Sequence, residues 1–126
     1  MEFERPVIKL DSVVLDCPDP KKLADFYEKL LGWKRSFIGE GWDAVSAPDG
    51  SFRIYFQFEP DYVPPVWPTS PDCQQIMAHL DFAVSDLDKA VAYAISCGAK
   101  LADVQYLENA RVCFDPAGHP FCLFQH

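Results

Sequence analysis

The sequence contains two halves that repeat one order of patterns, and this repeat restricts the fold more than any other feature. When Ser12 is aligned with His79, a shift of 67 positions, the apolar runs that follow them coincide. Each run leads into a helical pattern, and each half ends in a turn and a final strand, "PDGS" before "FRIYFQF" and "DPAGHP" before "FCLFQ". We therefore predict an α+β fold built from two tandem βαβββ modules.

Both predicted helices have the apolar spacing of an amphipathic helix, with the stripes Leu23, Phe26, Tyr27, Leu30 and Leu31, and Leu87, Ala90, Val91, Ala94 and Ile95. Asp19 and Asp86 stand where an N-cap side chain is expected, and Gly32 and Gly98 stand where a helix ends. We expect Tyr27 and Tyr93 to belong to the core.

The two modules are expected to form one domain that spans residues 1–126, with module one at 6–58 and module two at 76–126. The linker, residues 59–75, contains five prolines and is expected to be extended. It is interpreted either as a stiff connector or as a lid or packing surface that uses Tyr62, Val66 and Trp67.

Composition excludes several functions. A net charge of −8 would repel nucleic acid, and no apolar run approaches the about 20 residues that span a bilayer. The first residues lack the basic and apolar regions of a signal peptide, and the five cysteines show no CxxC spacing. Reduced thiols in a cytoplasmic protein are the expectation.

The strings "VVLDCPDPKKLADFYEKLLGW", "HLDFAVSDLDKAVAYAISCGAK" and "DPAGHPFCLF" resemble the vicinal oxygen chelate superfamily of glyoxalase I, bleomycin-resistance proteins and extradiol dioxygenases. The resemblance implies that each module curls a mixed sheet into a half-barrel around a concave pocket, and that the chain forms a homodimer. It also implies four divalent-metal positions, one in the first and one in the last strand of each module.

Position by position, the resemblance supplies few good ligands. His79 matches the histidine of the superfamily, Ser12 takes the equivalent place in module one, and Cys122 stands where a glutamate is usual. Strand alternation places Tyr55 and Gln57 on the pocket face, so that either could take the fourth position. If a metal binds, the resemblance implies His79, Gln57 and Cys122 as its ligands, with Zn, Ni, Mn or Fe as the ion.

Two hypotheses for function stay open. The first is a metal-free protein that binds a small, aromatic molecule in a pocket lined by Ser12, Trp42, Tyr55, Gln57, Trp67, Asp81, Cys122 and Phe124. The second is a metal-dependent enzyme of the glyoxalase lyase or dioxygenase type, in which His79 and Gln57 hold the ion with help from Cys122 or water. If His79 is not a ligand, it is a candidate general base or hydrogen-bond partner in the pocket. The shortage of carboxylates at ligand positions favours the first, although Asp81 and Asp16 share the pocket face by alternation. His119, in the turn "AGHPF", is expected to be a surface residue.

Overall fold

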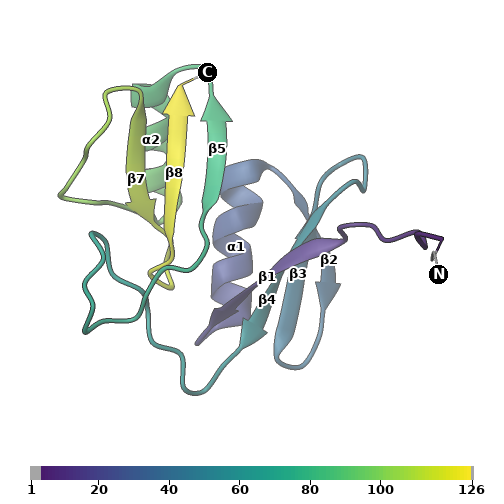
Figure 1. Cartoon of the computed structure of the whole chain (residues 1–126). Helices are drawn as coiled ribbons and strands as arrows, with labels where there is room; N and C mark the ends of the chain where they lie inside the picture. Colours follow the sequence, from purple (N-terminus) through teal and green to yellow (C-terminus); the bar gives the residue numbers. More distant parts are fainter. Residues whose placement is uncertain (1–3, 126) are drawn as a thin grey trace.

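A computed structural model describes residues 4–125 and consists of two modules joined by an irregular linker (Figure 1). Module one comprises β1 (Ser12–Cys17), α1 (Pro20–Leu31), β2 (Lys34–Ile38), β3 (Trp42–Ser46) and β4 (Arg53–Phe58). Module two comprises β5 (Leu80–Val84), α2 (Leu87–Cys97), β6 (Lys100–Leu101), β7 (Ala110–Phe114) and β8 (Pro120–Gln125). Neither helix of the described chain is long and apolar enough to cross a membrane.

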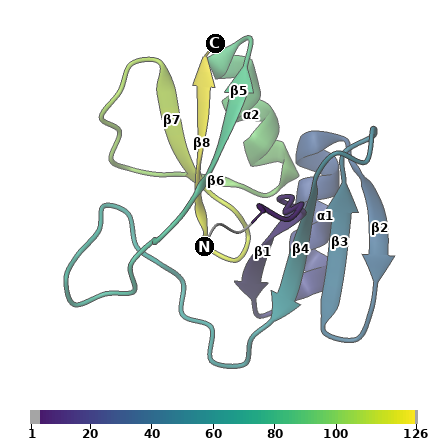
Figure 2. The ribbon, with the colours of Figure 1, turned by 45° about the vertical axis from the view of Figure 1, so that its right-hand side comes forward.

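Each module forms its own four-stranded mixed sheet with the same topology. The orders are β1-β4-β3-β2 and β5-β8-β7-β6, and in each sheet the first strand runs parallel to the last. The other pairings are antiparallel. The predicted α+β class with two βαβββ modules is therefore confirmed. β1 and β5 are the edge strands that the two sheets turn toward one another (Figure 2).

Local sequence signals explain where the helices begin and end. The carboxylates of Asp19 and Asp86 accept hydrogen bonds from the backbone N–H groups of Lys22 and Lys89, which satisfies a free donor in each first turn. Gly32 ends α1 with φ +68°, a left-handed conformation that glycine adopts without steric cost. The cap residues predicted from the sequence are the ones that the structure uses.

One hydrophobic core joins the two modules through α1, which lies between the sheets in Figure 1. Phe26 packs against Phe121 of module two, with ring centroids 5.9 Å apart, and Tyr27 stacks on Phe56 of module one at 5.4 Å. The helix-facing side of each sheet is thus buried, and the opposite side of each sheet is turned away from the core.

A buried hydrogen bond crosses the same interface. Tyr27 donates its hydroxyl proton to Asp115 Oδ2 at 2.8 Å, and the N–H groups of Ala117 and His119 donate to Asp115 Oδ1 at 2.9 and 3.0 Å. Burial raises the pKa of Asp115, while the charge of His119 and these hydrogen bonds lower it. Burial also raises the pKa of Tyr27, which therefore stays protonated as a donor.

Hydrogen bonds also join the linker to the turn before β8, and that turn to β1. Tyr62 donates a hydrogen bond to the carbonyl of Ala117 at 2.8 Å, and His119 Nε2 lies 2.7 Å from the carbonyl oxygen of Asp16 in β1. His119 lies in the turn before β8, as expected, but its ring is only partly exposed. Its ring lies half-buried between β1 and Tyr62 because the turn folds back across the module interface.

The expectation that Tyr93 belongs to the core was wrong. Its side chain is half exposed, and its hydroxyl donates to the carbonyl of Lys29 at the end of α1, 2.5 Å away. Tyr93 lies outside the apolar stripe of α2, so its ring packs at the margin of the contact between the helices.

Replacing Tyr27 with phenylalanine should lower the free energy of unfolding by about 1–3 kcal/mol at neutral pH, because Asp115 Oδ2 would lose its buried donor. Since that donor lowers the pKa of Asp115, the pKa should rise further in the variant. The loss should therefore shrink as the pH falls below the ordinary aspartate range, where Asp115 is protonated in both proteins. Denaturant unfolding at pH 7 and pH 3.5 measures both values. Tyr106→Phe, at an exposed tyrosine, is the control, and an equal loss at both pH values would contradict the expectation.

Candidate functional site

Strand alternation gives each sheet an outer face, directed away from the helices, and the candidate site residues lie on these faces. In β4, Ile54 and Phe56 are buried in the core, whereas Tyr55 and Gln57 are half-buried on the other side. The pairing register places Val14, Tyr55, Ala44 and Phe37 in one row across the sheet of module one. The side of β4 proposed from alternation is therefore the side on which Tyr55 and Gln57 lie.

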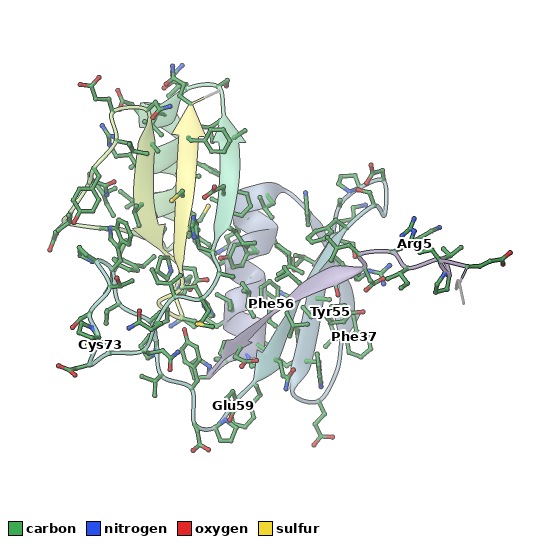
Figure 3. All side chains as sticks on the ribbon, viewed as in Figure 1. Arg5, Phe37, Tyr55, Phe56, Glu59 and Cys73 are labelled. Carbon is green, nitrogen blue, oxygen red and sulfur yellow. The ribbon has the colours of Figure 1, made fainter. Side chains whose placement is uncertain are left out.

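Three aromatic rings form a continuous cluster on the outer face of module one. Tyr55 lies in the middle, with ring centroids 6.4 Å from Phe37 and 6.0 Å from Trp42, and Trp42 meets it edge to face. Phe37 and Tyr55 lie near one another in Figure 3, although β3 separates their strands, β2 and β4. The side chains of Phe37 and Trp42 are 48% and 39% exposed, so the cluster presents ring surface to solvent.

The outer face of module two is polar where β5 begins. His79 Nε2 lies 3.0 Å from Asp81 Oδ1, and Asp81 is paired directly with Cys122 across the parallel β5–β8 ladder. One ligand atom from each of these three residues lies within 4.8 Å of the others. The structure therefore gathers an imidazole, a carboxylate and a thiol at one point.

The thiol of this group is protonated in the metal-free protein. Burial, together with the charge and hydrogen bonding of Asp81, raises the pKa of Cys122 to about 11. A thiol with that pKa is a poor nucleophile at neutral pH, because the thiolate is the reactive form. The geometry therefore favours a donor or ligand role for Cys122 over nucleophilic catalysis.

The remaining residues predicted from the sequence lie in three places: on the sheet of module one, on the sheet of module two and in the linker. Ser12 and Gln57 belong to the sheet of module one, so the two sheets of the chain hold separate parts of the predicted ligand set. Phe124 follows Cys122 by two residues on β8 and shares its face. Trp67 lies apart, with its indole N–H donating to the carbonyl of Val104 and its ring against Tyr106.

Sequence reasoning missed Phe37 as a member of the aromatic cluster. A register shift between Arg35 and Phe37 interrupts the pairing of β2 with β3, so simple alternation along "KRSFI" does not place the ring. The available signal was the pair of apolar residues, Phe37 and Ile38, that ends an otherwise polar strand.

The donors present in module two fit a metal ion, though not the usual set of the superfamily. Imidazole and thiolate are ligands of borderline and soft divalent ions, and Asp81 supplies the carboxylate that the usual ligand positions lack. Gln57 and Ser12 are weaker donors on the other sheet. The residues that would hold an ion are therefore His79, Asp81 and Cys122.

One groove lies beside β1 and another beside β5, the edge strands that the two sheets turn toward one another. One of about 410 Å³ lies between β1 and the segment before β5, with Asp16, Tyr62 and His119 in its wall. A second, of about 390 Å³, runs beside β5 and contacts Asp81 and Tyr93. Both grooves therefore lie at these edges, and no ring of the aromatic cluster lines either of them.

Comparison with known proteins agrees with this architecture. No curated protein matches the sequence. Among solved structures, a glyoxalase/bleomycin resistance protein/dioxygenase family enzyme from Burkholderia phytofirmans PsJN superposes with a TM-score of 0.69 at 18% identity, covering 91% of this chain and 96% of that one. Fosfomycin resistance protein FosX from Mesorhizobium loti gives 0.68 at 11% identity, over 96% and 94% of the two chains.

TnmS3, an antibiotic binding protein from Streptomyces sp. CB03234, gives a TM-score of 0.64 at 16% identity, over 97% of this chain and 98% of that one. At these identities the structural similarity concerns the fold alone. The family model described as "Glyoxalase-like domain" matches residues 12–124, from the first strand to the last. The chain therefore belongs to the family of glyoxalase-like domains, within the superfamily that its sequence motifs indicated.

Proposed function

We propose that the protein binds a small aromatic molecule, with the cluster of Phe37, Tyr55 and Trp42 as the platform that it stacks on. The observation that carries this proposal is the position of these rings, adjacent on one outer face and partly open to solvent. Aromatic side chains usually contribute to a core, so a partly exposed group in which one ring contacts two others is typical of a binding surface. Rings also bind flat ligands by offset or edge contacts.

Electrostatics narrows the ligand class. The chain has a net charge of −8, and Asp16, Glu59 and Asp61 line the groove beside β1 of the same module. A negative field disfavours anions and favours neutral or cationic molecules. A neutral or cationic aromatic compound therefore fits the site better than an acid.

All five cysteines are free thiols in the structure, which supports a cytoplasmic setting.

A homodimer would complete the pocket. Within one chain the outer faces are open, β1 and β5 are edge strands, and the arm before β1 exposes Val7, Ile8 and Leu10 (Figures 1 and 3). Open faces and edges of this size are commonly covered by a second copy around a two-fold axis. The outer face of one chain could then be closed by a face of its partner.

Binding of neutral and cationic aromatic compounds can be followed by tryptophan fluorescence across a compound panel. Trp42→Ala and Tyr55→Ala should each weaken binding about 3-fold to 10-fold, because an aromatic pair contributes about 0.5–1.5 kcal/mol beyond its buried area. Trp67→Ala is the matched control, since Trp67 packs on module two away from the cluster. Equal losses in all three variants, or no binding by any compound, would contradict the proposal.

The dimer can be tested by light scattering after size exclusion, which should report twice the 14.3 kDa chain mass. Val14→Lys places a charge on the outer face of module one and should shift the protein toward monomer. Ile95→Lys, on α2 and similarly exposed although Ile95 belongs to the apolar stripe of the sequence, should leave the mass unchanged. A monomeric wild-type protein at high micromolar concentration would contradict the expected assembly.

A second candidate function is a divalent-metal-dependent enzyme of the lyase or dioxygenase type. The observation that favours it is the cluster around His79, which stands where the superfamily has a ligand. The ligands given by the resemblance are His79, Gln57 and Cys122, and Gln57 would have to approach from the other sheet or from a partner chain. The ion would supply Lewis acidity for a bound oxygen substrate.

This second candidate predicts that Gln57 matters for metal binding. Calorimetric titration with Zn, Ni, Mn and Fe(II) should show affinity reduced about tenfold in Gln57→Ala, since a ligand would be lost. Unchanged metal affinity in Gln57→Ala would contradict a metal site shared between the two modules. It would not affect the proposal that the protein binds an aromatic molecule. Arg53→Ala, on the same strand face, is the control.

A further inference from the structure

We propose that the arm before β1, residues 4–11, lies in the β1 groove of a second copy of the chain and adds to the free edge of β1 there. The β1 groove is the groove of about 410 Å³ between β1 and the segment before β5. This inference rests on the homodimer proposed above, and it names the segment and the surface that hold the two copies together. Each chain then contributes residues to the groove of its partner.

The arm is apolar and lies apart from the rest of its own chain. Val7, Ile8 and Leu10 are 85%, 75% and 80% exposed, and residues 4–11 form no helix or strand. Figure 1 shows the arm projecting from the start of β1 away from both sheets. Large apolar side chains that stand so close together in sequence gain free energy when another surface removes them from water. The arm therefore has the properties of a docking segment.

The β1 groove offers apolar walls to such a segment. They include Val13 and Leu15 of β1, Val63 of the linker, and Ile76 and Met77 before β5. Of these, Val13 and Leu15 pack against the hydrophobic core, whereas Val63 and Met77 are largely exposed. An apolar segment laid along the groove would extend the core outward and cover the exposed side chains.

The free edge of β1 also has backbone groups for another strand. The carbonyl of Cys17 accepts from the N–H of Glu59, which follows β4, whereas the carbonyl of Asp16 lies 2.7 Å from His119 Nε2 in the groove wall. Successive residues of a strand direct their N–H and C=O groups to opposite edges, so those of Val14 point to the same edge as those of Asp16. An extended segment can bind there by strand addition, in which main-chain hydrogen bonds supply affinity.

Charge complements the apolar contact. Asp16, Glu59 and Asp61 line the groove, and no lysine or arginine of residues 4–125 does. The arm carries Arg5 and Lys9 on either side of Val7 and Ile8. Neither cation takes part in an ion pair within the described chain. Opposite charges arranged in this way steer association and fix the register of the docked segment.

The placement of the arm favours the groove of a partner over that of its own chain. Asp11 Oδ1 lies 3.3 Å from Arg53 Nη1, which holds the base of the arm beside the start of β4. Arg5 and Glu59 lie on opposite sides of module one in Figure 3, with β1 between them. A two-fold axis would place each arm in the other chain's groove, which closes the assembly at two copies.

Thiol crosslinking between two variants tests where the arm lies. Both full-length variants carry Cys73→Ser, which removes the exposed thiol of the linker. One also carries Ile8→Cys on the arm, and the other carries Val63→Cys in the groove. After mixing and treatment with a short bis-maleimide, we expect crosslinked dimer in the mixture and far less in either variant alone. Tyr106→Cys, at an exposed position between β6 and β7, replaces Val63→Cys in the matched control.

Substitution of the arm tests whether it stabilises the dimer. Ile8→Asp combined with Leu10→Asp should raise the dimer dissociation constant about tenfold or more, measured by light scattering over a dilution series, because two buried apolar side chains are lost. Leu107→Asp, at a similarly exposed leucine outside the groove, should leave the constant unchanged. Thermal unfolding should show that every variant is folded, since the arm contributes nothing to the core of its own chain.

The outcomes separate this inference from the proposals on which it rests. A monomeric wild-type protein would overturn both the dimer and the exchange of arms. A dimer that persists in the Ile8→Asp, Leu10→Asp variant, or a mixture that crosslinks no more than its Tyr106→Cys control, would overturn the exchange alone. A chain carrying both Ile8→Cys and Val63→Cys that crosslinks within itself in an excess of wild-type protein would assign the arm to its own groove, which also overturns the exchange. Binding of aromatic compounds is measured separately by tryptophan fluorescence.

Discussion

The contact between α1 and the turn of module two is the constraint on which the arrangement of this molecule depends. Tyr27 carries its hydroxyl through the core to Asp115, a carboxylate that is nearly fully buried and has its other oxygen bound by two backbone N–H groups. A buried carboxylate without these donors would cost several kcal/mol. This hydrogen bond between Tyr27 and Asp115 therefore favours one orientation of the two modules relative to each other.

The position of the site follows from that arrangement. Because both sheets direct their helix-facing sides into a common core, their outer faces point away from it, and each module presents its own surface. Among residues 4–125, no strand of one sheet is hydrogen-bonded to a strand of the other. The groups that a pocket would need are present on the outer faces, aromatic in module one and polar in module two.

Much of the fold could be predicted because it depends on local signals. Asp19, Asp86 and Gly32 mark helix ends through their own backbone chemistry, and alternation along β4 identifies the side that carries Tyr55. The partner of Asp115 could not be predicted, since it depends on which side chain 88 positions earlier reaches the turn after packing. For the same reason His119 looks like an ordinary turn residue in the sequence.

The two outer faces also differ in what their sequences could reveal. Alternation correctly places Asp81 on the face of Cys122, but only the parallel register of β5 with β8 makes them direct neighbours. Phe37 is displaced by an irregularity in β2, so its approach to Tyr55 is a property of the folded sheet. The halves of an internal repeat keep one topology because backbone pairing tolerates many side chains. The outer faces bear little of that constraint, so one half can carry rings and the other an imidazole, a carboxylate and a thiol.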